Sequence, residues 1–561
     1  MRRSSAIKEL VMMRILLGLG FLFNISLFFV GFITTFALYL YYISWMKPER
    51  TRNELRKQGI KGPNPLFFYG NLLEMKRILL EEKARRGREK GGACHIHHDY
   101  TSSVFPYFTQ WRKTYGHVFL YTMGNVPALH VSHPDVVKDI NLCLSLDLGK
   151  ATYLKKAHEP LFGHGILKSN GVLWAHQRKI IAPEFFLDKV KGMIELMIDS
   201  AISLVKLWYE KVEDGGGIVE VKVDDDLRSY SADVISRACF GSSYSKGKEI
   251  FSKLRALQQA VSKPNLLLEI TGLRQLPTKR NREVWKLSKE IHSLILKVVK
   301  ENNKEHQQEQ DEEDKKKCKN LLEAILKSVN GGHQHHQHNH NDNKNNDNNN
   351  NDNDDMDKFI VDNCKTIYFA GHETTAVTAT WCLMLLALHP DWQDRARAEL
   401  VSVCGPGSVP DAQALQKMKL LTMIIQETLR LYPPGAYVTR ETLQDMKLGG
   451  IHIPKGVNIY VPVPTLHHDP TAWGPDVHRF NPDRFTNGVR GACKLPHMYV
   501  PFGAGTRTCL GQTFAMTELK IVLALILNNF SFSLSPKYKH SPVLRLIVEP
   551  EFGVDLIVKK V

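Results

Sequence analysis

A cysteine near the C-terminal end of the chain lies among glycines, in the run PFGAGTRTCLG at residues 501–511. The three glycines permit tight turns and let a flat ligand approach the backbone closely. An apolar helical pattern over residues 512–527 follows directly, so Cys509 is expected at a helix N-terminus. The helix dipole and free N–H groups there favour the thiolate, the form of cysteine that binds metals. We therefore interpret Cys509 as a metal ligand and the other cysteines as small core residues.

A second pattern of residues that could take part in a reaction lies inside an apolar run. This run predicts one long helix over residues 356–388. The sequence AGHETT in its middle places Glu373 beside Thr374. A threonine within a helix normally hydrogen-bonds to the carbonyl four residues earlier, here that of Ala370. Loosening that bond would open a polar groove for oxygen and water, with Glu373 as a proton route. The alternative is a Thr374 satisfied by its own helix and a solvated Glu373.

An acid and a base three residues apart form the third pattern. Glu427 and Arg430 would share one helical face, and most such pairs are solvated. Apolar residues surround this pair, however, which indicates burial. A buried pair needs further hydrogen bonds to offset its desolvation. Arg484, in the later run FNPDRF, is the expected third member.

The fourth pattern is W-x-x-x-R, formed by Trp174 and Arg178. One helical turn separates these residues, so both side chains can face the same edge of a ligand. An ordinary surface helix is the alternative interpretation of this short pattern.

Together, these patterns resemble the motifs of the cytochrome P450 family, the haem-thiolate monooxygenases. The spacing F-x-x-G-x-R-x-C-x-G from Phe502 is similar to the haem-binding loop of that family. The resemblance implies haem b with Cys509 as the axial iron ligand, and thiolate ligation favours O–O cleavage. It also implies a mainly α-helical body with a small β-rich lobe, and haem buried between two long helices.

The resemblance further assigns roles to the other motif residues. Phe502, Gly505 and Arg507 would contact haem. Arg507 and Arg178 would pair with its propionates, and Trp174 would donate its indole N–H to one.

The same resemblance gives the remaining motif residues two different kinds of role. Glu373 and Thr374 would act in oxygen activation. Glu427, Arg430 and Arg484 would form a structural triad behind the haem.

A narrower resemblance concerns the substrate. The segments 153–163 and 166–186 look like the plant clan that oxidises isoprenoids and hormones, and residues 376–386 are similar to its gibberellin branch. This implies hydroxylation or epoxidation of a gibberellin, with another terpenoid acid as the alternative. The resemblance places the pocket walls at residues 99–107, 367–375 and 435–438.

Electrons must come from a partner, because the sequence contains no flavin or nicotinamide domain. The family implies a membrane-bound flavoprotein reductase fed by NADPH. A basic face near Arg490 and Lys494 could meet it, although a solvated face is an equal alternative. A haem-thiolate isomerase or dehydratase would need no reductase but often lacks the threonine that Thr374 provides. A non-enzymatic haem or metal-binding membrane protein is a third interpretation.

An N-terminal anchor must hold this body at a membrane. Residues 15–45 carry no charge, and crossing a bilayer takes about 20 apolar residues. Aromatic residues gather at the end of this span, and basic residues dominate after it, which favours a cytosolic body. We expect a basic N-terminus over residues 1–14, a single transmembrane helix over 15–45, a basic and proline-containing hinge over 46–65, and location in the endoplasmic reticulum membrane. A buried core helix is the alternative.

The catalytic domain should occupy residues 66–561. Segments 119–121 and 128–131 read as two short strands around a turn. Residues 331–355 are almost wholly His, Gln, Asn and Asp, which predicts a disordered insertion. Its histidines could bind zinc or nickel, but a tolerated surface insertion is favoured.

Composition sets the outer limits on the chain. Hydrophobic residues are 43% of the 561 residues and charged residues 24%, which excludes a mainly disordered or fibrous protein. Nine cysteines without a C-x-x-C pair argue against a disulfide-stapled secreted protein. The net charge of +16 permits nucleic acid, anionic lipid or an acidic protein as partners. The family resemblance selects lipid and reductase, with no nucleic acid.

Overall fold

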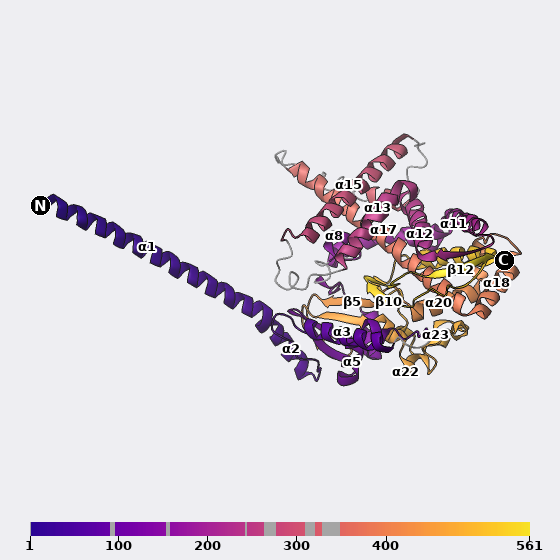
Figure 1. Ribbon diagram of the computed structural model, residues 1–561, viewed down its shortest axis with the longest axis horizontal. Helices are drawn as coiled ribbons and strands as arrows, with labels where there is room; N and C mark the ends of the chain where they lie inside the picture. The colour runs from indigo at the N-terminus through magenta and orange to yellow at the C-terminus, as the bar shows by residue number, and fades with distance from the viewer. Residues whose placement is uncertain are drawn as a thin grey trace.

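The computed structural model describes residues 2–89, 96–152, 158–241, 244–262, 276–308, 320–327 and 348–561. A long N-terminal helix projects from a body of helices and small sheets (Figure 1). It consists of α1 (Arg2–Tyr41), the π-helical η1 (Tyr42–Met46) and α2 (Lys47–Lys57) in direct succession. Its apolar part has the length and composition to cross a membrane, with a mean hydropathy of 2.3 and none of that window buried. This fits the predicted single span and excludes the buried core helix.

The segment predicted as a hinge, residues 46–65, is packed onto the body over much of its length. Helix α2 buries Leu55 completely in the core that includes Leu129 and Val461 of the five-stranded sheet. We call this part of the body the small lobe. The Gln58 side chain donates to the carbonyl of His452 and accepts from its N–H, both at 2.8 Å. The anchor and the small lobe are therefore connected by helix rather than by a free linker.

Helices dominate the body, as predicted. The longer ones follow the apolar patterns of the sequence, and α17 runs through its centre (Figure 1). The remaining α-helices are α3 (Leu72–Glu89), α4 (Thr101–Val104), α5 (Pro106–Tyr115), α6 (Pro134–Leu142), α8 (Glu159–Phe162), α9 (Gly171–Ile181), α10 (Leu187–Lys191), α11 (Ile194–Asp214), α12 (Val223–Phe240), α13 (Tyr244–Val261), α15 (Lys279–Gln308), α17 (Asn348–Leu388), α18 (Pro390–Cys404), α19 (Ala412–Lys417), α20 (Lys419–Leu431), α21 (Val463–His467), α22 (Pro470–Trp473), α23 (Gly488–Ala492) and α24 (Gln512–Asn529).

The strands form small sheets, of which the largest has the order β1-β2-β8-β5-β3. The predicted strands at 119–121 and 128–131 are confirmed as β1 and β2, which pair antiparallel around a turn at Gly124. The strands are β1 (Val118–Met123), β2 (Val126–Val131), β3 (Leu148–Gly149), β4 (Ile218–Lys222), β5 (Tyr437–Thr442), β6 (Met446–Leu448), β7 (Ile451–Ile453), β8 (Asn458–Pro462), β9 (Phe530–Leu534), β10 (Pro542–Arg545), β11 (Ile547–Pro550) and β12 (Asp555–Lys560).

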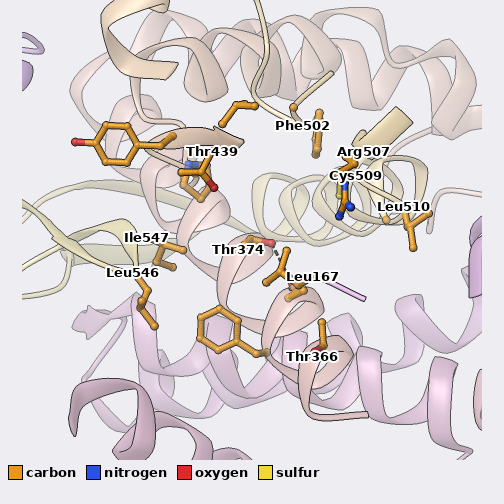
Figure 2. Close-up of a pocket in the computed structure, with 18 of the residues that line it drawn as sticks. Leu167, Thr366, Thr374, Thr439, Phe502, Arg507, Cys509, Leu510, Leu546 and Ile547 are labelled. Carbon is orange, nitrogen blue, oxygen red and sulfur yellow. Dashed lines mark hydrogen bonds between the residues drawn. The ribbon is translucent and has the colours of Figure 1, made fainter. Parts of the chain in front are cut away.

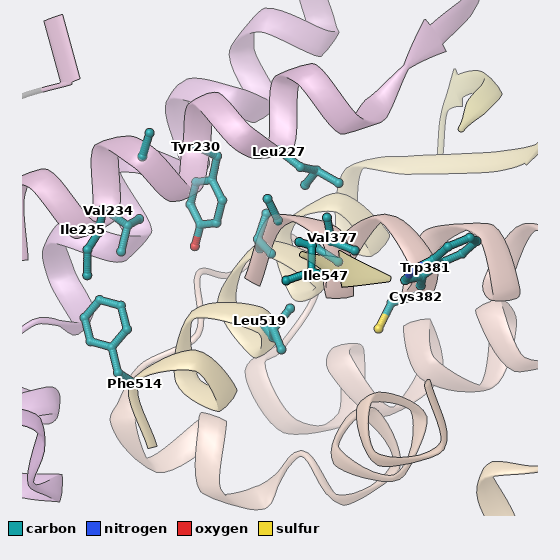
Figure 3. Close-up of a cluster of buried hydrophobic side chains, with 14 of the residues drawn as sticks. Leu227, Tyr230, Val234, Ile235, Val377, Trp381, Cys382, Phe514, Leu519 and Ile547 are labelled. Atoms are coloured by element: carbon teal, nitrogen blue, oxygen red, sulfur yellow. The ribbon is translucent and has the colours of Figure 1, made fainter. Parts of the chain in front are cut away.

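The core of the helical body lies where α12, α17 and α24 meet (Figure 3). Tyr230 of α12, Trp381 of α17 and Leu519 of α24 all contribute to it. Gly371 permits the close approach of α17 to α12, because a Cβ there would lie 2.5 Å from the Ile235 side chain. A second core, which includes Leu129 and Val461, belongs to the small lobe.

Helix α17 confirms the long helix predicted over residues 356–388, and it begins earlier, at Asn348. The histidines of the predicted insertion lie outside the described residues, as does all of 331–347. The prediction of disorder is wrong for residues 348–355, which form the first turns of α17. Disorder over 331–347 and metal binding stay predictions.

Candidate active site

A cavity of about 720 Å³ lies between α17 and the loop before α24 (Figure 2). One wall comes from the middle of α17, including Ala370, Gly371 and Thr374. The facing loop contributes Phe502, Gly503, Arg507 and Cys509. Most of the remaining lining is apolar, and it includes the tip of the β10–β11 hairpin at Leu544, Leu546 and Ile547.

Two of the three predicted pocket walls are confirmed, and one is wrong. Residues 435–438 line the cavity, as do Ile367 and its neighbours on α17, but no residue of 99–107 does. Phe105 of that segment packs against the ring of Tyr437, with centroids 5.2 Å apart, and is buried in the core. The segment therefore supports a wall from behind. Residues 166–168 line the cavity in its place.

The backbone around Cys509 is held by short-range contacts. The Cys509 N–H donates to the carbonyl of Phe502 at 2.9 Å. Gly505 has a φ of +72°, and a Cβ there would lie 2.6 Å from the Asn141 carbonyl oxygen, so glycine is required. Helix α24 begins at Gln512, which confirms the predicted position of Cys509 just before a helix.

The Cys509 thiol is accessible from the cavity but is otherwise enclosed by protein. Burial raises its pKa, whereas the Gly511 N–H and the charge of Arg178 lower it. The predicted N-terminal stabilisation of the thiolate is present, but burial is the larger effect. A metal ion bound to the sulfur would reverse this balance, since a coordinating thiol is deprotonated.

Trp174, Arg178 and Arg507, predicted to face one ligand edge, meet at the cavity. The Arg507 guanidinium lies 4.2 Å from the Trp174 ring centroid and that of Arg178 lies 5.6 Å from it. Arg507 also donates to the Ser169 carbonyl at 2.9 Å, and Arg178 donates to the Thr508 carbonyl at 3.1 Å. These bonds connect the last turn of α9 and the segment before α9 to the Cys509 loop.

Three further cations at this site were missed from the sequence, namely Lys150, Lys168 and Arg440. Arg440 of β5 is buried and donates to the Ala504 carbonyl at 3.3 Å, and burial lowers its pKa to about 10. Lys150 follows β3, where burial and the neighbouring Arg440, Lys168 and Arg507 lower its pKa well below its usual value. The pairing of β3 with β5 brings Lys150 and Arg440 together. A lone arginine in the alternating strand YVTRET was the only available signal.

The charged lining of this cavity suits an anionic ligand. Within the described chain, its charged lining residues are Lys150, Lys168, Arg178, Arg440 and Arg507, with no Asp or Glu. Haem b carries two propionates, so it matches this cluster while its iron can meet Cys509. The residues present therefore fit haem.

Thr374 matches the alternative of a hydroxyl satisfied by its own helix, whereas Glu373 matches neither interpretation considered above. Thr374 lines the cavity, and its hydroxyl donates to the Ala370 carbonyl at 2.8 Å, so its own helix satisfies it. Glu373 is 2% exposed and does not line the cavity. It is neither solvated nor in a polar groove, because it pairs with Arg255 at 2.9 Å and Arg228 at 3.4 Å.

The predicted triad of Glu427, Arg430 and Arg484 is assembled behind the loop. Arg430 donates to both carboxylate oxygens of Glu427, at 2.7 and 2.8 Å, and both residues are fully buried. Three backbone carbonyls accept the remaining Arg430 hydrogen bonds. Arg484 is a looser member, 3.6 Å from Glu427 and 2.7 Å from Asp476.

The sequence profile of the cytochrome P450 family matches residues 91–556. The chain belongs to the cytochrome P450 family. It is 56% identical over 96% of its length to cytochrome P450 714B2 of Oryza sativa subsp. japonica, of which the match covers 96%. It is 56% identical to cytochrome P450 714B3 of Zea mays, with 94% of each chain covered. Cytochrome P450 714A2 of Arabidopsis thaliana is 43% identical, with 90% of this chain and 92% of that protein covered.

Membership confirms the predicted enzyme class and the predicted P450 fold. This P450 is a haem-thiolate monooxygenase that acts on a small molecule and receives its electrons from a reductase. The resemblance to plant P450s is likewise confirmed by these relatives.

Proposed function

We propose that this P450 is an NADPH- and O2-dependent monooxygenase that hydroxylates or epoxidises a terpenoid, with a gibberellin as the first choice. The observation that carries the chemistry is the Cys509 thiol at a largely apolar cavity. The likeness of residues 376–386 to the gibberellin branch supports the substrate. Another terpenoid acid is the alternative.

In this proposal, bound haem supplies oxygen activation, and the protein holds and orients it. Cys509 ligates the iron. Arg178, Arg507 and the Trp174 indole N–H hold the propionates, with Arg440 and Lys150 as additional cations. Phe502 and Gly503 line the cavity where the flat ligand would approach the loop, whereas Gly505 does not line it and holds the loop against Asn141.

Thr374 and Glu373 are proposed to handle protons on the opposite side of the cavity. The Thr374 hydroxyl lies at the cavity wall. Once this hydroxyl releases the Ala370 carbonyl, it can pass a proton into the cavity. Glu373 must first leave Arg255 before its carboxylate can exchange a proton with the cavity. Glu427, Arg430 and Arg484 act as scaffold and take no part in turnover.

The membrane and the redox partner complete the proposal. We place α1 in the endoplasmic reticulum membrane with the body in the cytosol. A membrane-bound flavoprotein reductase fed by NADPH would dock on the exposed Arg490 and Lys494. Opposite charges on the reductase would steer this encounter.

The test is to incubate microsomes containing the full chain and a reductase with a panel of gibberellins, NADPH and oxygen. We expect products that have gained one oxygen atom, formed only with both NADPH and oxygen. A panel without any oxygenated product removes the gibberellin assignment, and a panel of other terpenoid acids then follows. Product that forms without NADPH would support an isomerase or dehydratase.

A further inference from the structure

Lys168 is a buried cation that the roles above do not use. It lies between the Cys509-facing helix α9 and the short helix α8, and it lines the cavity. Its side chain is largely enclosed, since the residue is 9% exposed. No carboxylate pairs with its ammonium in the parts of the chain that the structure describes. Its ammonium faces the Phe162 ring, whose centroid lies 5.7 Å from Nζ, and its charge also acts on the neighbouring Lys150.

This environment is unfavourable for an ammonium group without a counter-ion. Lysine is almost never buried unless it is paired, because burial removes its hydration. The same burial lowers the pKa of Lys168 to about 8, which leaves it mainly charged at neutral pH. A cation that borders an otherwise apolar cavity is well placed to bind an anionic group of whatever enters.

Haem does not supply enough negative charge to balance this cavity. Its two propionates would face five basic lining residues, of which Lys168, Arg178, Arg440 and Arg507 are counted as charged, and no acidic residue lines the cavity in the described chain. Arg178 and Arg507 contact the shared ring of Trp174. Lys168 instead contacts Phe162, which packs on Phe369 of α17 with ring centroids 5.2 Å apart. It therefore belongs to the wall shared with α17.

We propose that Lys168 binds a carboxylate of the substrate, so that this P450 selects an apolar skeleton carrying a free acid. The inference deepens the proposed function and rests on its monooxygenase cavity. It does not depend on the acid being a gibberellin. A terpenoid ester or alcohol of the same shape would lack the charge that Lys168 requires.

The test measures binding to the haem-loaded full chain in detergent, through the haem absorption change and by equilibrium dialysis. The probes are matched pairs of acid and methyl ester: the gibberellins of the panel, and abietic acid with methyl abietate. We expect wild-type protein to bind at least one acid about tenfold or more tightly than its ester, as a charge-assisted hydrogen bond provides. Lys168→Met should remove this preference by weakening acid binding alone, and Lys168→Arg should retain most of it.

Lys179→Met is the matched control, because Lys179 is an exposed lysine of α9 outside the cavity lining. Lys168→Gln serves as a second variant if Lys168→Met loads haem poorly. Equal binding of acid and ester by wild-type protein, binding of none of the acids, or a preference that survives in Lys168→Gln would overturn the proposal. Haem loss with an unchanged acid preference would assign Lys168 to a propionate instead. A preference for abietic acid alone would uphold Lys168 while removing the gibberellin assignment.

Discussion

The Nη1 atom of Arg255 donates to both carboxylate oxygens of Glu373, at 3.1 and 2.9 Å. This contact ties α13 to α17 and holds Glu373 among charged neighbours rather than in the cavity. Burial alone would raise the Glu373 pKa, but His372, Arg228 and Arg255 together lower it below its usual value of 4.5. The acid proposed for proton delivery is thus ionised and restrained in this conformation.

Replacing Arg255 should make the protein less stable at neutral pH. A lowered carboxyl pKa stabilises the folded state above the unfolded pKa, and this contribution is lost as the pH falls through the folded pKa. We expect Arg255→Met to cost about 1–3 kcal/mol at pH 7, and the difference from wild type to shrink in acid below pH 4.5. Denaturant unfolding in detergent at several pH values measures it.

Arg77→Met is the control for that experiment, because the exposed Arg77 forms only a loose pair with the exposed Glu81, at 3.9 Å. It should change stability by a few tenths of a kcal/mol. A pH-independent loss in Arg255→Met would contradict the ionic role of this contact.

Loss of the Glu427 carboxylate should prevent haem incorporation. Glu427→Ala leaves the fully buried Arg430 guanidinium without its counter-ion, which costs about 3–5 kcal/mol. Haem per protein chain is the measurement. Asp394→Ala removes an exposed partner from a matching i, i+3 pair with Arg397, and it should load haem normally. Normal loading of Glu427→Ala would show that the triad is not required.

The axial thiolate can be tested by the carbon monoxide difference spectrum of reduced microsomes. Wild-type protein should show the red-shifted Soret band of the family, and Cys509→Ser should lose it because the hydroxyl is not a thiolate donor. Cys404→Ser, at the end of α18, is the control and should keep the band. A band at the ordinary haem-protein position in wild type would remove Cys509 from its assigned role.

Reversing the charge at the proposed reductase surface should slow electron delivery. We expect the double variant Arg490→Glu and Lys494→Glu to reduce about tenfold or more slowly at low salt, and wild-type rates to fall with added salt. Stopped-flow reduction by the reductase measures this. Lys455→Glu, an exposed lysine between β7 and β8, is the control. Salt-independent wild-type kinetics would exclude steering by this face.

Deleting residues 331–347 should leave activity unchanged with and without added zinc. The deletion stops before Asn348, where α17 begins, so the helix that lines the cavity is retained. Long loops add little closure entropy, so the shorter connection should not destabilise the body. Turnover that responds to zinc only in the full chain would instead support metal binding by the histidines.

Local spacing explains which features could be predicted from the sequence. Cys509, Trp174 and Arg178 were identified because their roles depend on positions within one loop or one helix. Lys150 and Arg440 were missed because only strand pairing brings them together. A local pattern also could not predict that the Glu373 side chain turns toward Arg255, because Arg255 lies 118 residues away in the chain.

The predicted position of one cavity wall was wrong for the same reason, because it depends on packing between segments far apart in the chain. The family resemblance implies a pocket wall at residues 99–107, but Phe105 packs its ring against Tyr437. Whether an aromatic side chain faces a cavity or a core depends on the partner across the fold, which spacing along the chain does not reveal.

The unbroken helical path from α1 into α2 has a consequence for how the enzyme meets lipid. With Leu55 fixed in the small lobe, the tilt of α1 in a bilayer also sets the tilt of the catalytic body. The exposed Phe67 packs against Tyr41 and Trp45 at the end of the anchor, with ring centroids 6.1 and 5.7 Å apart. This tip of the lobe would then lie at headgroup depth, and the body would retain mainly rotation about the membrane normal. With the membrane-bound reductase of our proposal, the encounter would be confined to the plane of the membrane, and the proposed docking face would lie at a defined height.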